Sequence, residues 1–121
     1  MEINEYQRRA MDTRMGSCAN DTYMLFGLMA EVGEIADKIA KWRRKGNISM
    51  DTDLMVFNTS NVQDVKEYKT ELMKELGDCM WFIAGIADQL GFSMEDVCQT
   101  NLAKLKDRQR RDVIVGEGDN R

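Results

Sequence analysis

The chain contains no proline among its 121 residues, and this absence constrains its fold more than any other single feature. Proline interrupts α-helices because it lacks a backbone N–H and clashes with the preceding turn. A chain without proline can therefore form long, unbroken helices. Apolar residues recur at intervals of three and four along most of the sequence, which predicts that these helices are amphipathic.

Capping residues and glycines mark where each predicted helix begins and ends. A polar residue such as Asn20 or Ser93 precedes a periodic segment as an N-cap, and glycines such as Gly46 and Gly91 follow one as a stop. The predicted helices span residues 2–15, 21–45, 65–90 and 94–111. We expect an all-α, four-helix bundle-like protomer that forms one domain over residues 1–121.

The helical pattern breaks in two places. Residues 47–64 are turn-like around the short apolar run Leu54–Phe57, and residues 113–121 are too rich in glycine to continue a helix. A loop as long as 47–64 in a compact domain is usually functional or mobile. We expect it to be a long loop or arm that either packs against a neighbouring subunit or lies over a site as a lid. Residues 113–121 are predicted to form a C-terminal tail.

Composition excludes several classes of protein. A net charge of −4 argues against a general nucleic-acid binder, because such binding requires a basic surface. No apolar run approaches the ~20 residues of a membrane span. The 3 cysteines lie far apart with no CxxC spacing, which is typical of a reducing compartment. We therefore expect a cytoplasmic protein with neither nucleic acid nor membrane as a partner.

Two acidic motifs lie on the second and third predicted helices. Glu31 and Glu34 are three residues apart, as are Glu75 and Asp78, so each pair shares a helix face. Each pair also lies at the same margin of its helix's apolar stripe. The stripes consist of Leu28, Val32, Ile35 and Ile39 on the second helix and Leu72, Leu76, Cys79, Ile83 and Ile86 on the third. Packing the stripes together would bring all four carboxylates into one cleft.

Carboxylates in a shared, partly apolar cleft repel one another unless a cation lies between them. The chain has no histidine, and hard oxygen ligands without imidazole or thiolate favour Mg²⁺, with Mn²⁺ as the alternative. A carboxylate-bridged di-iron bundle is disfavoured, since that design uses Glu-x-x-His motifs.

A single pair of acids at this spacing is more often solvated helix surface than a site. The second reading therefore stays open: a non-catalytic helical module that binds nucleotide or a partner protein, with its acid pairs apart in space. Thermal melting with and without Mg²⁺ distinguishes this module from a metal-dependent enzyme, because only converging carboxylates should be stabilised by the ion.

Basic and polar residues share a face of the fourth predicted helix. Asn101, Lys104 and Arg108 lie there at steps of three and four, beside apolar Val97 and Leu105. Such a face suits phosphate oxygens, which lysine binds as a point charge and arginine as a fork. The alternative is that the basic side chains extend from the edge of the core to solvent. Lys38, one turn after Glu34, has the same two readings.

Three stretches together resemble a known family: LMAEVGEIADKIAKW, ELMKELGDCMWFIAGIADQLGFSMEDV and NLAKLKDR. The sequence from about Asn4 to the C-terminus is similar to the MazG-like nucleotide pyrophosphohydrolases of the all-α NTP pyrophosphatase superfamily. The resemblance implies Mg²⁺-dependent hydrolysis of a nucleoside triphosphate to monophosphate and pyrophosphate, in dimers or tetramers. It implies metal ligands at Glu31, Glu34, Glu75 and Asp78 and phosphate contacts at Asn101, Lys104 and Arg108. The connection between the acidic motifs is longer here than in compact members, so base contacts are not transferred.

The sequence leaves the identity of the base that activates water open. It is one of the four carboxylates of the acidic motifs, or Glu71 one turn before Glu75. Aromatic residues at helical spacing are predicted to be core or interface rather than base-stacking groups. These are Tyr6, Trp42, Trp81 and Phe82. A second apolar row on the third helix predicts a subunit interface of a homodimer or homotetramer. This row consists of Met73, Met80, Ala84 and Ala87.

Overall fold

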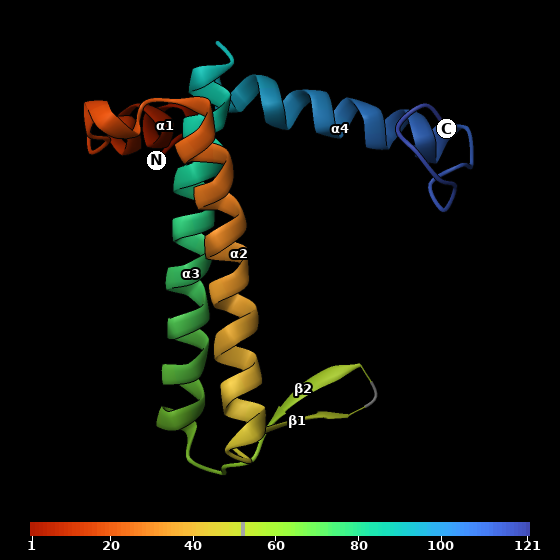
Figure 1. The fold of residues 1–121 in the computed structure, drawn as a ribbon. Helices are drawn as coiled ribbons and strands as arrows, with labels where there is room; N and C mark the ends of the chain where they lie inside the picture. Colours follow the sequence, from red (N-terminus) through yellow and green to blue (C-terminus); the bar gives the residue numbers. More distant parts are fainter. Residues whose placement is uncertain (52) are drawn as a thin grey trace.

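The computed structural model describes residues 1–51 and 53–121, and two long antiparallel helices dominate it. Helices α2 (Asp21–Arg44) and α3 (Val62–Gln89) lie side by side along their length (Figure 1). Helix α1 (Ile3–Met11) and the short 3₁₀ turn η1 (Gly16–Cys18) lie at the end where α2 begins. Helix α4 (Met94–Arg110) leaves from that same end and points away from the pair.

Local capping chemistry explains where α2 begins and ends and where α4 begins. The Asn20 side chain accepts a hydrogen bond of 2.8 Å from the Tyr23 N–H, and Gly46 follows α2 with a φ of +77°. Ser93 forms a capping box with Asp96, in which each side chain accepts from the other's backbone N–H. The caps predicted at Asn20 and Ser93 are confirmed.

Two helix boundaries differ from the prediction by more than one residue. Helix α1 ends at Met11, four residues before its apolar periodicity runs out, because the chain turns at residues 12–13 and then enters η1. Helix α3 begins at Val62, three residues earlier than predicted. Asn61 makes the earlier start possible, since its side chain accepts the Gln63 N–H at 2.9 Å.

The segment 47–64 contains a β-hairpin, so the strictly all-α prediction is wrong in this detail. Strand β1 (Ile48–Asp51) pairs antiparallel with β2 (Leu54–Phe57). The Phe57 ring stacks on Tyr68 of α3 at 5.6 Å, and Tyr68 meets Trp42 of α2 edge-on at 4.8 Å. These aromatic contacts hold the base of the hairpin against the helix pair, and strands β1 and β2 extend away from it (Figure 1).

A four-helix bundle within the protomer is not confirmed. Figure 1 shows α4 beside the other helices only at its beginning. Gln7 of α1 fixes that beginning: its side chain accepts the Met94 N–H at 3.0 Å and donates to the Phe92 carbonyl at 3.0 Å. The rest of α4 extends away from the core.

The core lies where α1, α2, α3 and the start of α4 meet. One cluster joins Cys18, Met24 and Phe82, and a second joins Ala84, Ala87 and Met94. Gly27 permits the first, because a Cβ at that position would lie 2.0 Å from the Phe82 ring. None of the helices in the described residues is long and apolar enough to cross a membrane.

The predicted subunit interface on α3 is wrong for most of its residues. Ala84 and Ala87 are buried by Met94 and by α1, and Met80 packs against the same cluster. The second partner of α3 is thus α1 of the same chain. Met73 alone of this row stays largely exposed.

Candidate metal centre

Three carboxylates converge between α2 and α3. Glu31, Glu75 and Asp78 each offer an oxygen, and these oxygens lie within 4.8 Å of one another. Glu75 and Asp78 share a face of α3 because they are three residues apart, and Glu31 faces them from the antiparallel α2. We call these three residues the acidic cluster. It lies near the middle of the helix pair, away from both the hairpin and α4 (Figure 1).

Glu34 lies one turn further along α2, exposed and outside this group of oxygens. Its charge still reaches the cluster, because it contributes to the raised pKa of Glu31. The structure therefore brings together three of the four acids that the sequence indicated and places the fourth beside them.

The acidic cluster is electrostatically unfavourable when it holds no cation. Burial raises the pKa of Glu31, and the charges of Asp78 and Glu75 raise it further. Lys38 offsets part of the charge, with its Nζ 3.4 Å from Glu75 Oε1 and 3.7 Å from Glu71 Oε2. Oxygen donors of this kind, on two rigid helices, fit a hard divalent cation such as Mg²⁺.

The residues predicted to bind phosphate lie in two separate places. Lys38 is beside the acidic cluster, where it is paired with glutamates. Asn101, Lys104 and Arg108 are on the part of α4 that extends away, so this protomer does not bring them to the cluster (Figure 1). By the rise of an α-helix, Arg108 lies about 20 Å along α4 from its N-terminus.

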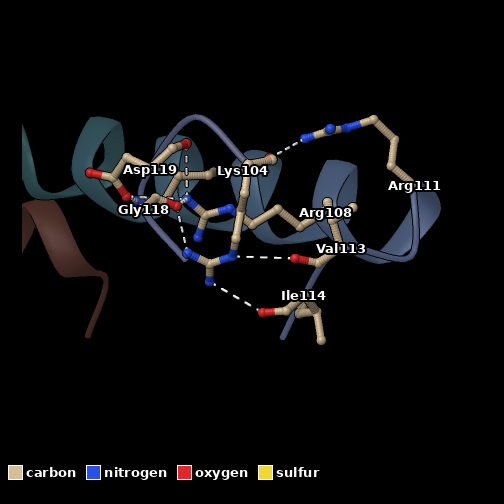
Figure 2. Close-up of polar contacts among 8 residues, drawn as sticks. Lys104, Arg108, Arg111, Val113, Ile114, Gly118 and Asp119 are labelled. Atoms are coloured by element: carbon tan, nitrogen blue, oxygen red, sulfur yellow. Dashed lines mark hydrogen bonds and ion pairs between the residues drawn. The ribbon is translucent and has the colours of Figure 1, made fainter. Parts of the chain in front are cut away.

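Lys104 and Arg108 contact the tail in this structure (Figure 2). Asp119 Oδ1 lies 3.0 Å from Lys104 Nζ and 3.1 Å from Arg108 Nη2. Arg108 is almost fully buried by these contacts, whereas Asn101 is exposed. Lys104 and Asn101 also line an open hollow of about 740 Å³ on α4.

The acidic motifs and the basic face of α4 both lie within the part of the chain that matches a known domain family. The model of the MazG nucleotide pyrophosphohydrolase domain matches residues 20–112, which include both acidic motifs and the basic face of α4. The chain belongs to the MazG family. It is also 38% identical, over the whole of both chains, to the Gene 37 protein of Mycobacterium phage L5. No solved structure matches it.

A second hollow of the MazG domain opens directly beside the acidic cluster. It encloses about 600 Å³, and Glu31 forms one wall. Tyr23 and Phe26 of α2 line it with substantially exposed rings, and buried Phe82 also lines it. Neither Tyr23 nor Phe26 was predicted to be a site residue. Their positions, eight and five residues before Glu31 on the same helix, could have indicated that they lie near the acidic cluster.

The aromatic residues that the sequence did single out are mainly structural in this MazG domain. Trp42 is buried, and Tyr6 packs on the cluster around Ala84. The Trp81 indole donates to the Ala10 carbonyl at 3.1 Å and to Thr13 Oγ1 at 2.9 Å. The prediction that they pack in the core is confirmed for these three residues.

Proposed function

We propose that this MazG protein is a divalent-metal-dependent nucleoside triphosphate pyrophosphohydrolase. It cleaves the α–β phosphoanhydride of an NTP or dNTP to yield the monophosphate and pyrophosphate. The observation that supports this most is the convergence of Glu31, Glu75 and Asp78 from two helices within 4.8 Å. These residues, together with Glu34, are the proposed ligands for Mg²⁺, or for Mn²⁺ in its place.

Bound Mg²⁺ supplies neutralising charge for the triphosphate and an acidified water. The protein's own residues supply orientation and a proton acceptor. Glu34 and Glu71 border the acidic cluster, while the group of converging oxygens among the described residues contains neither. We infer that one of these two carboxylates accepts the proton of the attacking water. If Glu34 is that base, the metal ligands are Glu31, Glu75 and Asp78 alone.

Lys38 is proposed to move from its glutamate partners to a substrate phosphate. Its ammonium is a compact point charge on a flexible four-carbon stem, so it can exchange one anionic partner for another. In the structure it contacts Glu71 and Glu75 at 3.7 and 3.4 Å, distances that are long for strong ion pairs.

The site is proposed to be completed in a homodimer or homotetramer. An apolar face of the helix pair stays more than half exposed, and a second copy would cover it. This face consists of Leu25, Met29 and Val32 on α2 and Met73 and Leu76 on α3. Because α4 extends away from its own acidic cluster, assembly is also the way to bring Lys104 and Asn101 of one copy to the carboxylates of another.

A panel of nucleoside triphosphates with Mg²⁺, read out as monophosphate and pyrophosphate, tests the proposed function. Glu31→Gln should remove the activity. Asp37→Asn is the matched control, because Asp37 is an exposed acid of the same helix that pairs with Lys41. A wild-type protein that releases no pyrophosphate from any nucleotide contradicts the proposal.

The alternative of a non-catalytic binding module required the acid pairs to lie apart in space. Convergence of Glu31 with Glu75 and Asp78 removes that basis. The same panel separates the two functions, since a module that only binds nucleotide would retain the triphosphate intact.

A further inference from the structure

The C-terminal tail forms a closed loop at the end of α4 (Figure 2). Arg121 holds it shut by donating from Nε to the Val113 carbonyl and from Nη2 to the Ile114 carbonyl, both at 3.2 Å. Arg111 of the helix end donates to the Arg121 carbonyl in turn. The tail therefore has a fixed shape made by its own hydrogen bonds.

Asp119 of this loop bridges two cations of α4. Its Oδ1 accepts from Lys104 Nζ at 3.0 Å and from Arg108 Nη2 at 3.1 Å. Arg108 Nη2 also donates to the Gly118 carbonyl at 3.3 Å and to the Asp119 carbonyl at 3.0 Å. Backbone contacts thus set where Asp119 lies, and the position of its carboxylate does not depend on the ion pairs alone.

The two cations differ in what they can still bind. The Arg108 side chain is 5% exposed, so a phosphate could reach it only if the tail lifted away. The Lys104 side chain is 38% exposed and borders the hollow that Asn101 and Thr100 also line. An ammonium has three donors, and Asp119 accepts only one of them.

We propose that Asp119 is a positioning residue, which holds the Lys104 ammonium at the edge of the α4 hollow so that Lys104 and Asn101 receive the phosphates of the nucleotide. Arg108 anchors the tail and does not touch substrate. This replaces the direct phosphate contact that the sequence predicted for Arg108, and it rests on the proposed function.

An acidic tail could instead occupy the phosphate site as a competitor, but the contacts disfavour this. A competing segment must leave readily when substrate arrives. Lifting this tail would break the bonds of Arg108 to Gly118 and Asp119 and would separate Lys104 from its carboxylate. Within the described chain, Arg108 Nε is a buried donor without a hydrogen-bond partner, which costs free energy in the closed state, so the contacts of Arg108 Nη2 and Lys104 must supply the stability of closure.

Steady-state kinetics of Asp119→Asn on an active nucleotide test the positioning role. We expect KM to rise about 3- to 10-fold, the loss for one partly exposed charge-assisted hydrogen bond, with kcat within about twofold. Glu117→Gln is the matched control, because Glu117 is an exposed acid of the same tail that forms no ion pair among the described residues. An unchanged or lowered KM in Asp119→Asn would overturn the proposal, and a lowered one would identify the tail as a competitor.

A double-mutant cycle shows whether Asp119 acts through Lys104. In a Lys104→Met background, Asp119→Asn should add no further increase in KM, whereas additive effects would overturn the proposal. Far-UV circular dichroism and melting temperature establish that each variant is folded.

If the wild-type protein hydrolyses no nucleotide, the proposed function fails, and binding then tests Asp119 separately. Titration calorimetry with inorganic tripolyphosphate should give weaker binding to Asp119→Asn than to wild type. Equal affinity would overturn the positioning role. With an active wild type, a failure confined to Asp119→Asn leaves the proposed function standing.

Discussion

The acidic cluster of the helix pair and the basic end of α4, which carries Lys104 and Arg108, each bring like charges together. They differ in how far the protein itself compensates those charges. At the basic end, Asp119 pairs with both Lys104 and Arg108 and offsets part of their positive charge, and their hydrogen bonds lower the pKa of the Asp119 carboxyl. In the acidic cluster, burial and mutual repulsion raise the pKa of Glu31.

This contrast indicates which region depends on an added ion. At the basic end, each of the two cations has a carboxylate partner within the protein, so its geometry should persist without ligand. The acidic cluster has the partial compensation of Lys38 and keeps an excess of negative charge. A divalent cation should therefore change the behaviour of the cluster far more than that of α4.

The largest expected effect follows from removing a carboxylate of the acidic cluster. Asp78→Ala should lower pyrophosphate release at least about 100-fold, since even residues that only support a metal ligand typically cost 10- to 100-fold. Glu34→Ala should also abolish release if Glu34 is a ligand or the base. Nucleotide assays with retained helical circular dichroism check both. Full activity of Asp78→Ala would contradict the metal assignment.

Millimolar Mg²⁺ should raise the melting temperature of the wild-type protein by several degrees. An ion present at ten times its Kd stabilises the folded state by about 1.4 kcal/mol. Glu31→Gln should lose this response, because the amide removes a ligand and also relieves repulsion in the ion-free protein. Asp119→Asn should keep the full response. Equal responses of Glu31→Gln and wild type to Mg²⁺ would show that the acidic cluster depends on the ion no more than α4 does.

The response to Mg²⁺ should shrink as the solution is acidified from about pH 7 to about pH 5. The pKa of Glu31 is higher in the folded ion-free protein than its ordinary value, so Glu31 contributes stability below its unfolded pKa that is lost as pH rises. Mg²⁺ binding requires the ionised carboxylate and therefore competes with this proton. Thermal melts with and without Mg²⁺ across this range measure the effect. A response that stays constant with pH would show that Glu31 is not a ligand.

Local sequence signals predicted the helices well because helix ends are fixed by neighbouring residues. The Asn20 and Ser93 caps and the Gly46 stop needed no tertiary information. The hairpin was missed because each strand is four residues long, too short to show alternation, and its stability comes from Phe57 stacking on the distant Tyr68.

The candidate site was predictable to the extent that helix periodicity places side chains. Offset from the apolar stripes predicted that all four carboxylates would meet. Glu31, Glu75 and Asp78 do, whereas Glu34 lies outside their group. Periodicity cannot say how many helices cover a stripe, so Val32 and Leu76 were predicted to be core and are more than half exposed.

The return of the tail onto α4 had no local signal. It depends on tertiary contacts, in particular those of Arg108 with the Gly118 and Asp119 carbonyls. Sequence spacing therefore placed Arg108 correctly on the basic face and could not show that this side chain is buried.

The smallest expected effect concerns Lys38, which lies beside the acidic cluster. Lys38→Met should tighten Mg²⁺ binding by up to about fivefold, because partly exposed ion pairs contribute about 0.2 to 1 kcal/mol and Lys38 competes with the ion for Glu75. The same change should raise KM for the nucleotide if Lys38 moves to a phosphate. Lys41→Met is the matched control, since Lys41 pairs with Asp37 on the same helix. Calorimetric titration with Mg²⁺ alone separates the two roles: an unchanged Mg²⁺ affinity would show that Lys38 does not compensate the cluster.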